Sequence, residues 1–578
     1  MTLSQPSASL PAWRVAVIAI VGILAVGIGV ALGSFLLSAR TASLGGGASY
    51  VPASAPFYFE MRLEPSASQD AALRELLGRF PPIDGVDLAR PLYEQLTEKL
   101  DEAVATSGDL SWSEDVAPWF DGRIGVALLD LPVESFAAPI DPLATPAVPP
   151  MVLLLGVTDA AEAADAIDRL LAFPAEAPTF TEQVHAGTTI HVAEGDMGAY
   201  ALTADQLLIA PGAADIEAAL DARASGSTTL AEAAEITQLT DQLPADWLAF
   251  GVYDMTDLMA AAFDQAADAS PGMEAFRDLI EHQSLRGAIA ITASGDRFAV
   301  ETVTDAPTGP LAVTNADRGL AAEVPADALF YSEGGNLGAG FAASIGPMRE
   351  SLATIPGLGE QIDTIESALG ADLEEMVAWM GDGAMAVGWD GTTPYGGLVI
   401  VPIDADDARR RLDQLATFAG LASLDPTTGI SVTERDVESV SVTTIRWADP
   451  NAVEQDPLMA PVAPPEVVIE WAVTDDRVYL GVGDAFVPRV LALDDGDSLA
   501  TVARYGDAIA GFGGPSNAGV AWADLRGVRE AIESAIGGEG LGSYEADILP
   551  WLAPLDRLVS VSRLDGGVLI GSFALLMD

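Results

Sequence analysis

The chain of 578 residues contains no cysteine. Without thiols it can form no disulfide and no thiolate metal site, and it has neither a cysteine nucleophile nor a lipid-modified N-terminal cysteine. If the body of the protein is exported, its hydrophobic cores alone must hold it together, which domains of this size can manage.

Positive charge is scarce. The sequence has 27 basic residues against 85 acidic ones, which gives a net charge of −58, and Lys99 is its single lysine. Phosphate backbones and anionic lipid headgroups repel a body of this charge. We therefore expect no nucleic-acid partner.

Charged residues are also missing from Val15 to Ala39, which is a continuous apolar run. At ~1.5 Å per residue a helix over this run reaches ~37 Å, enough to cross a hydrocarbon core of ~30 Å. A cleaved signal peptide is the alternative, but its apolar region is normally ~7–15 residues and ends at a small-residue cleavage site. We predict an uncleaved transmembrane helix over 13–39, after a short N-terminal tail (1–12) and before a glycine-rich tether (40–49).

The orientation of this helix is weakly determined, because Arg14 and Arg40 lie near its two ends. The free amino terminus and Arg14 favour a cytoplasmic tail. We therefore expect a single-pass membrane protein whose C-terminal body lies outside the cytoplasm, attached to the membrane by its N-terminal helix.

The remaining sequence contains one unit twice. VPASAPFYFE (51–60) returns as VPADALFYSE (324–333), and LLLGVTDAAEAADAIDRLLAF (153–173) returns as LVIVPIDADDARRRLDQLATF (398–418). Other blocks match in the same order: Trp119 with Trp379 and their neighbours, TTIH (188–191) with TTIR (443–446), 200–210 with 471–481, 249–258 with 519–528, and 286–298 with 556–568. We predict two tandem homologous domains, repeat domain 1 (50–306) and repeat domain 2 (321–578), joined by a linker (307–320).

Periodicity predicts the elements of each unit. Apolar residues follow one helical stripe over 160–171, with Asp159 in the N-cap position and Asp404 in the equivalent place of the second unit. MVLLLGV (151–157) reads as a buried strand, and 286–305 alternates around Ser-Gly-Asp as a hairpin. Hairpins outnumber β-α-β crossovers, so each unit is expected to be α+β, with a mostly antiparallel sheet and helices packed on one face.

These blocks together resemble a bacterial family of exported or membrane-anchored proteins, the domain of unknown function 3352. The resemblance rests on the VPA-x-A-x-FY opening, the glycine-rich strand near Trp119, and the strand-Asp-helix block. It extends over almost everything after residue 50. It implies an anchor followed by an extracytoplasmic body, and it assigns no activity.

Histidine offers little for catalysis or metal binding. His185 and His191 flank AGTTI, and a turn at Ala186 and Gly187 could bring them together, but a metal site needs three or four ligands. His191 aligns with Arg446 of the second unit, which indicates a solvated cation rather than a ligand. His282, in LIEHQ, reads as a polar position near a helix end.

Other motifs are incomplete. The sequence around Ser344 lacks the first glycine of a nucleophile elbow, and the second unit contains no histidine to act as base. Gly481 and Gly483 follow a strand as in a dinucleotide loop, but Phe486 replaces the third glycine, so we expect a tight turn with a capping aspartate.

Acidic clusters at 404–407 and 494–497 could supply oxygen ligands to calcium, although solvated caps and loops explain them equally. Paired carboxylates for glycoside hydrolysis leave no local signature. No residue is therefore assigned as catalytic, cofactor-binding or metal-binding.

The sequence favours a non-enzymatic binding or scaffold protein of the cell envelope, since two similar units favour bivalent engagement of an envelope partner. The first alternative is a carrier or sensor of an apolar, lipid-like ligand. The second is a hydrolase that uses carboxylates. Trp119 and Trp379, at matching positions, are expected to be core residues.

Overall fold

The computed structural model describes residues 45–105, 111–130, 149–171, 179–194, 198–224, 228–269, 277, 283–353, 358–391, 393–448, 466–494, 496–536 and 541–578. The tail and transmembrane helix predicted over 1–39 lie outside these residues. Within the described ranges, no helix combines the length and the apolar character needed to cross a bilayer.

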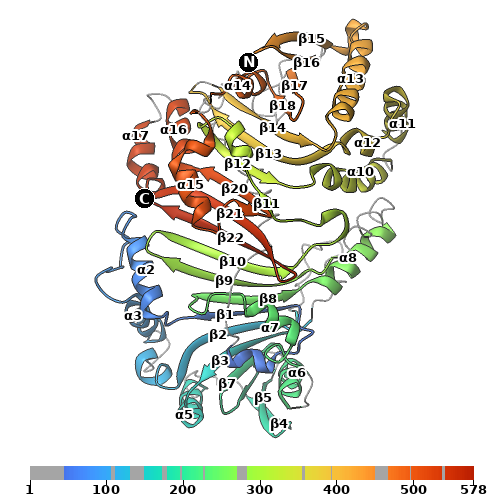
Figure 1. Cartoon of the computed structure of the whole chain (residues 1–578). Coiled ribbons are helices and arrows are strands. Elements are labelled where there is room, and N and C mark those ends of the chain that lie inside the picture. The colour runs from blue at the N-terminus through green and yellow to red at the C-terminus, as the bar shows by residue number, and fades with distance from the viewer. Residues whose placement is uncertain are drawn as a thin grey trace, which may run out of the picture.

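One 20-stranded sheet runs along the described chain (Figure 1). The first half of the chain supplies β1 (Phe57–Arg62), β2 (Phe120–Leu128), β3 (Met151–Val157), β4 (Phe180–His185), β5 (Thr188–Ala193), β6 (Ala199–Leu202), β7 (Gln206–Ala210), β8 (Ala249–Asp254), β9 (Arg286–Ser294) and β10 (Arg297–Asp305). The second half supplies β12 (Ala328–Gly334), β13 (Met380–Trp389), β14 (Pro394–Pro402), β15 (Ile430–Val437), β16 (Val440–Ala448), β17 (Glu466–Val473), β18 (Val478–Val482), β20 (Gly519–Asp524), β21 (Leu555–Asp565) and β22 (Val568–Met577). A separate ribbon pairs β11 (Ala316–Asp317) with β19 (Ser516–Asn517).

The strand order is the same in both halves of the sheet. It runs β4-β5-β6-β7-β3-β2-β1-β8-β9-β10 in the first half. In the second half it runs β15-β16-β17-β18-β14-β13-β12-β20-β21-β22. All of these pairs are antiparallel, so the predicted mostly antiparallel α+β fold is confirmed.

The two halves meet edge to edge at the centre of the sheet. The last strand of each half pairs with the other, and in this β10–β22 pair Glu301 lies opposite Ser572. The ladder is continuous from Arg297 to Asp305, so the halves share one sheet rather than resting side by side. In Figure 1 the green β10 and the red β22 lie next to each other in the middle of the molecule.

Helices occupy the connections between strands. Those of the first half are α2 (Ala67–Leu77), α3 (Leu92–Ala105), α5 (Ala160–Leu171), α6 (Ala213–Ala224), α7 (Ala234–Thr240) and α8 (Thr256–Ala269). Those of the second half are α10 (Leu337–Ala353), α11 (Leu358–Leu369), α12 (Leu373–Val377), α13 (Ala405–Ala422), α14 (Phe486–Leu491), α15 (Ala503–Ala510), α16 (Leu525–Ile536), α17 (Leu541–Ser543) and α18 (Leu549–Leu552). The helix predicted over 160–171 is confirmed as α5, and Asp159 accepts the N–H groups of Ala161 and Glu162 as its cap.

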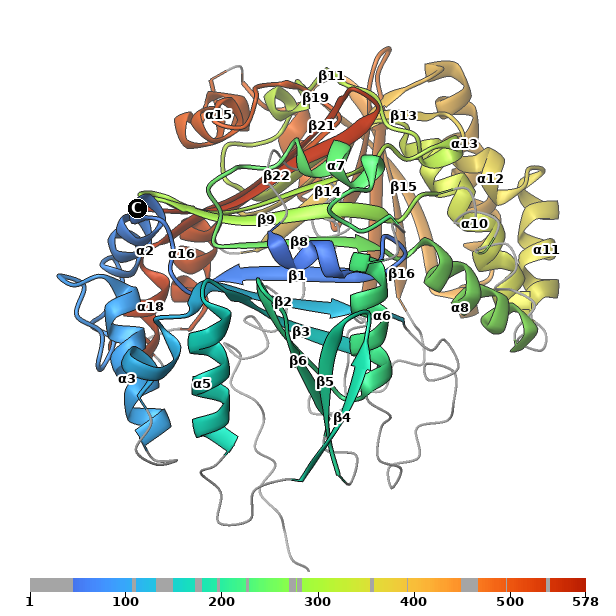
Figure 2. The same ribbon diagram turned by 90° about the horizontal axis from the view of Figure 1, so that it is seen from below.

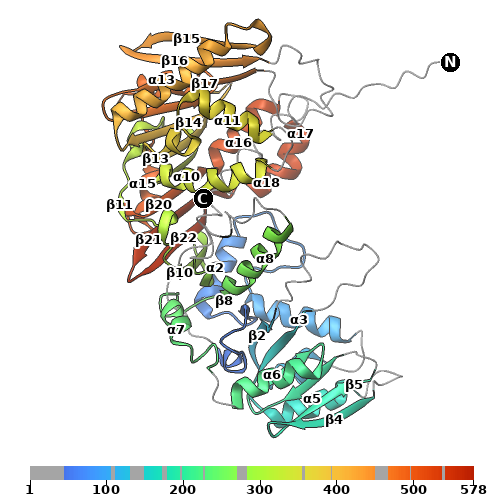
Figure 3. The same cartoon turned by 90° about the vertical axis from the view of Figure 1, so that its right-hand side faces the viewer.

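Helices cover both faces of the sheet, so the prediction of one covered face was wrong. On β3, Leu154 belongs to a core with Ile216 of α6, whereas Leu155 packs with Ala163 of α5. Successive strand residues point to opposite faces, which places α5 and α6 on opposite sides. Figure 3 shows α7 and α15 on one side and α8 and α18 on the other. The uninterrupted apolar run MVLLLGV is typical of a strand buried on both faces.

The two halves also touch through side chains at one end of the central strands. The rings of Phe80, just after α2, and Trp551, on α18, lie 6.3 Å apart. The guanidinium of Arg79 donates to the carbonyl oxygens of Met577 and Gly295, each at 2.6 Å. Figure 2 shows the blue helix α2 beside the red α18. These contacts tie the halves together beyond the shared ladder.

The predicted core tryptophans are confirmed. Trp119 is 5% exposed and Trp379 is 2% exposed. Each indole N–H donates to a backbone carbonyl, from Trp119 to Asp115 at 2.7 Å and from Trp379 to Met376 at 2.8 Å. Each ring packs in a core with the helix that follows the third strand of its half, α5 or α13.

Part of the predicted tether is packed structure. The glycines predicted as flexible over 40–49 form, from Gly46, a short 3₁₀-helix, η1 (Gly46–Tyr50), whose Gly47 is buried. A Cβ on Gly47 would stand 2.8 Å from the Tyr58 hydroxyl oxygen. These glycines therefore permit close approach of backbone to side chain, instead of giving freedom to a linker.

The predicted linker over 307–320 is likewise packed against the body. It contains the 3₁₀-helix η4 (Gly309–Leu311) and leads into η5 (Leu320–Glu323). The guanidinium of Arg318 is buried and donates to the carbonyl oxygens of Asn517 and Ala518, and it pairs with Asp382 at 3.2 Å. This stretch is fixed at its C-terminal end by buried hydrogen bonds.

Candidate functional site

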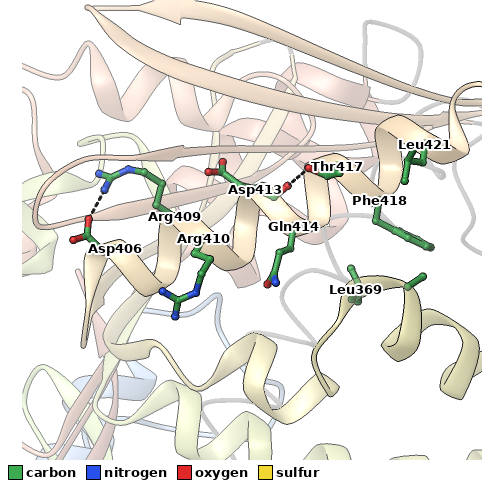
Figure 4. Close-up of a pocket in the computed structure, with 10 residues that line it drawn as sticks. Leu369, Asp406, Arg409, Arg410, Asp413, Gln414, Thr417, Phe418 and Leu421 are labelled. Atoms are coloured by element: carbon green, nitrogen blue, oxygen red, sulfur yellow. Dashed lines mark hydrogen bonds and ion pairs between the residues drawn. The ribbon is translucent and has the colours of Figure 1, made fainter.

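A surface groove of about 500 Å³ lies between α11 and α13 in the second half (Figure 4). Ten residues line it: Ala368, Leu369, Asp406, Arg409, Arg410, Asp413, Gln414, Thr417, Phe418 and Leu421. Most of them belong to α13, and α11 provides the opposite wall. The volume falls within the range of ~300–1,000 Å³ that is usual for ligand pockets.

The sequence of α13 explains why this helix presents a polar side to the groove. Asp404 caps the helix by accepting the N–H groups of Asp406 and Asp407. The small and apolar residues Ala408 and Leu412 then pack against the sheet with Trp379. Residues between them in helical phase face outward, so charged side chains line the groove.

One end of the groove is charged but balanced. Arg409 pairs with Asp406 at 2.8 Å, and Arg410 pairs with Asp407, which lies just outside the lining. Two arginines and two aspartates (with Asp413) contribute equal and opposite charge to the lining. In a chain of net charge −58, this is a locally neutral surface.

The other end of the groove is apolar. Figure 4 shows Phe418 of α13 and Leu369 of α11 turned toward one another across it. Leu421 is 64% exposed and Leu424, just beyond the helix, is 78% exposed. Exposed leucines beside a groove, with charged residues at its rim, match the apolar centre and polar border of protein interfaces.

The lining holds no hydroxyl nucleophile with a histidine base beside it. It contains no histidine and no serine, and its one hydroxyl, on Thr417, donates to the Asp413 carbonyl at 2.8 Å. A nucleophile needs an adjacent base within hydrogen-bond reach. These residues do not form such a pair.

The structure separates the histidines that the sequence placed near each other. His185 ends β4 and lies 2.6 Å from Asp221 of α6, whereas His191 on β5 stacks on Tyr200 with 4.6 Å between ring centres. Across the described residues, no group of three or more histidine, aspartate or glutamate side chains is arranged to hold a metal. His282 lies outside the described residues.

The alignment of His191 with Arg446 was wrong by three residues. The turn Ala186–Gly187 and the turn Glu438–Ser439 both have positive φ angles, and each closes the hairpin at the edge of its half. Counting from these turns, His191 corresponds to Thr443. The identical TTI triplets misled the comparison, because strand register is fixed by turn geometry and not by a short identity.

The remaining motifs have structural roles. Ser344 lies inside α10 and donates to the Gly340 carbonyl at 2.9 Å, far from any elbow geometry. The expected tight turn after β18 is confirmed by the φ of +84° at Gly483. The expected capping aspartate is wrong there, because Asp484 pairs with Arg446 at 2.8 Å and α14 has no side-chain cap.

The carboxylates of the first acidic cluster, 404–407, have partners within the protein. Asp404 is a helix cap, and Asp406 and Asp407 pair with arginines of the same helix. Asp497 donates its N–H to the Asp494 carbonyl in a turn. These contacts account for the first cluster without a bound cation.

A buried tyrosine–glutamate pair, present once in each half, was not predicted from the sequence. The repeated openings share Tyr-x-Glu, and in each half the tyrosine hydroxyl donates to the glutamate: Tyr58 to Glu60 at 2.6 Å, and Tyr331 to Glu333 at 2.5 Å. Both glutamates are less than 5% exposed, and burial raises their pKa above the usual 4.5. Identity at both positions of the repeated opening was the signal that could have found them.

These two pairs differ in their backbone partners. Glu333 also accepts the N–H groups of Gly319 and Leu320 at 3.1 and 3.2 Å. For Glu60, Oε1 has no partner among the described residues, and Gly45 leaves the space that its carboxylate fills. Glu333 thus fastens the segment before β12 to the core, whereas the Glu60 carboxylate packs against Gly45 in the segment before β1.

Comparison with known proteins gives one match. The sequence pattern of the family described as protein of unknown function (DUF3352) matches residues 15–536. No curated protein and no solved structure matches the chain.

Proposed function

Because the chain belongs to the DUF3352 family, whose function is unknown, we propose a role from the molecule itself: a single-pass, membrane-anchored, extracytoplasmic protein that binds a protein partner at the cell envelope and catalyses no reaction. The observation that carries the proposal is the groove between α11 and α13, with its exposed leucines and balanced charges.

The partner is a protein segment with an apolar anchor and charges of both signs. Its apolar side chain would enter between Leu369 and Phe418 and cover Leu421, which gains free energy by leaving water. Its charged residues would meet Arg409, Arg410 and Asp413 at the rim. An amphipathic helix presents this combination with a spacing of three or four residues.

The anchor supports an envelope location. The apolar run ends at Ala39, and Gly45 is the first described residue. Even a fully extended chain spans at most ~3.6 Å per residue, so Gly45 would lie within about 22 Å of the end of the predicted membrane helix. The first half of the body is thus held close to the membrane, while the groove belongs to the second half.

We further propose that the two halves are homologous domains that arose by duplication. The shared strand order and the matching Tyr-x-Glu openings support this origin. The antiparallel pairing of β10 with β22 is what two identical units would form when they associate about a two-fold axis.

Site-specific cross-linking in cells tests the binding proposal. A photoreactive residue replaces Thr417 in the groove, and a control chain carries it at Val184, which is 74% exposed on β4 of the first half. We expect a discrete adduct from position 417, recovered with membranes after an alkaline wash, and none from position 184. Leu421→Glu should reduce the adduct at least tenfold. Identical adducts from both positions, or none from position 417, would contradict the proposal.

A further inference from the structure

A second, smaller pocket of about 330 Å³ lies where the start of β12, the end of β13 and the first turns of α16 meet. Its lining combines one aromatic ring with carboxylates: Asp327, Leu329, Trp389, Gly391, Asp524, Gly527, Glu530, Ala531 and Ser534. A neighbouring groove of about 390 Å³ also includes Asp327 in its wall. Asp327 therefore stands between two adjoining hollows.

The carboxylate of Asp327 is held by donors from two elements. The hydroxyl of Tyr395 on β14 donates to Oδ1 at 2.5 Å, and the guanidinium of Arg489 on α14 donates to Oδ2. The same guanidinium lies 4.7 Å from the centre of the Tyr395 ring. Three side chains thus fix one another, and burial with the nearby carboxylate raises the pKa of Tyr395.

Asp524 is fixed in a similar way. Arg504 donates to both of its oxygens, at 2.9 and 3.2 Å, and the N–H of Gly527 donates to Oδ1 at 3.0 Å. A two-point arginine contact sets the plane of a carboxylate as well as its charge. Both aspartates therefore enter the pocket lining with fixed orientation. Asp524 Oδ1 already accepts two donors, whereas Asp524 Oδ2 and both oxygens of Asp327 retain lone-pair capacity for a further donor.

The aromatic wall is anchored from behind. Trp389 packs with Val528 and Ala531 of α16 and with Leu329. The absence of a side chain at Gly527 allows this close packing, because a Cβ there would stand 2.7 Å from Leu329 Cδ2. The indole is thus held in place next to the two oriented carboxylates.

Charge balance decides the class of ligand. Asp327 pairs with Arg489, and Asp524 pairs with Arg504, which also pairs with Asp556. The remaining acid of the lining, Glu530, pairs with no arginine among the described residues. A cation would find little net attraction here. Oriented, neutralised carboxylates instead accept hydrogen bonds from hydroxyl groups, and an aromatic ring provides an apolar face for the C–H side of a sugar ring.

We infer that this pocket binds a saccharide unit, with Asp327 and Asp524 accepting its hydroxyl groups and Trp389 covering its apolar face. In the first half of the chain, counting from the paired Tyr58 and Tyr331, Ser54 occupies the place of Asp327. The site is separate from the α11–α13 groove, so the test of saccharide binding does not depend on the protein-binding proposal.

Saturation-transfer NMR on the detergent-solubilised full chain tests the inference, with methyl glycosides of glucose, galactose and N-acetylglucosamine as ligands. We expect at least one glycoside to receive saturation with millimolar affinity. Asp327→Asn keeps the shape of the side chain but should weaken binding at least tenfold, and Glu530→Gln should change it less than twofold. Asp254→Asn, at the position of Asp524 in the first half, is the matched control and should bind like the wild type.

Two outcomes would overturn the inference. The first is the absence of saturation transfer to all three glycosides. The second is binding of an organic ammonium such as choline that weakens with salt and is lost in Glu530→Gln, which would make the pocket a cation site. Thermal unfolding of each variant within a few degrees of the wild type shows that a lost signal reflects the site and not the fold.

Discussion

Replacing Tyr58 by phenylalanine removes the one hydrogen-bond donor that the described structure provides to the buried carboxylate of Glu60. The matched change, Tyr331→Phe, removes the same hydroxyl from Glu333, which keeps two backbone N–H donors. The two variants delete the same atom from the same position of each half. They differ in the hydrogen-bond donors that remain for the carboxylate.

The expected magnitudes follow from hydrogen-bond energetics. A bond to a charged group contributes ~1.5–3 kcal/mol, and a buried acceptor left without a partner costs ~1–3 kcal/mol. We expect Tyr58→Phe to lower the free energy of unfolding by about 2 kcal/mol at pH 7, and Tyr331→Phe by about 1 kcal/mol. For units of about this size, a loss of 1 kcal/mol lowers Tm by ~2–4 °C. Tyr58→Phe should therefore lower Tm by about 4–8 °C, and Tyr331→Phe by about 2–4 °C.

The pH dependence has a definite sign. Burial raises the pKa of Glu60 above 4.5, while the Tyr58 hydroxyl lowers it in part. A raised pKa means that the contribution of Glu60 to stability is complete below pH 4.5 and declines as the pH rises through the raised value. Without Tyr58 the pKa rises further, so the stability gap between wild type and Tyr58→Phe should widen as the pH increases above 4.5.

Thermal unfolding followed by circular dichroism at pH 4.5, 5.5, 7 and 8 measures these gaps. The double variant Tyr58→Phe with Glu60→Gln provides the control, because removal of the acid should recover part of the loss at pH 7. The reasoning is refuted if Tyr58→Phe costs no more than Tyr331→Phe, or if its gap is widest at the lowest pH.

Two further predictions concern packing and charge. Arg435→Leu should lower the free energy of unfolding by about 2 kcal/mol, because it leaves the fully buried Glu470 with Thr444 as its remaining described donor. Arg446→Leu breaks more exposed ion pairs and should lower it by ~0–1 kcal/mol. Urea unfolding at fixed pH compares the two variants. Gly47→Ala should lower the free energy of unfolding by ~1–3 kcal/mol, because its Cβ would stand 2.8 Å from the Tyr58 hydroxyl oxygen. In Gly46→Ala the new Cβ would stand 3.3 Å from its nearest side-chain atom, so this variant should be nearly neutral by the same measurement. Equal effects within either pair would contradict the reasoning.

Local patterns in the sequence gave reliable local structure. The stripe over 160–171 became α5, the Ser-Gly-Asp turn became the β9–β10 hairpin, and the repeated tryptophans became core residues. These features depend on contacts within a few residues, or on burial that hydrophobicity alone enforces. They are visible without knowledge of which strand lies beside which.

Features that depend on distant contacts were missed or misread. The TTI identity suggested a match of His191 with Arg446, but the edge hairpins set the register three residues away. The glycines at 45–47 looked like a tether, because nothing local reveals that the Tyr58 hydroxyl lies against them. Nothing local marks the residues of α13 as the wall of a groove, since α11 is distant in the sequence.

The sequence by itself determined the composition of the protein: a strongly acidic chain without thiols, an apolar segment near its start, and two similar units of hairpins and helices. Tertiary structure alone decided that the last strands of these units pair with each other, that helices cover both faces of the sheet, and where the pockets of the second half lie. The reason is physical, since hydrophobic period and turn chemistry act over a few residues, whereas an edge strand carries unpaired N–H and C=O groups that accept many different partners.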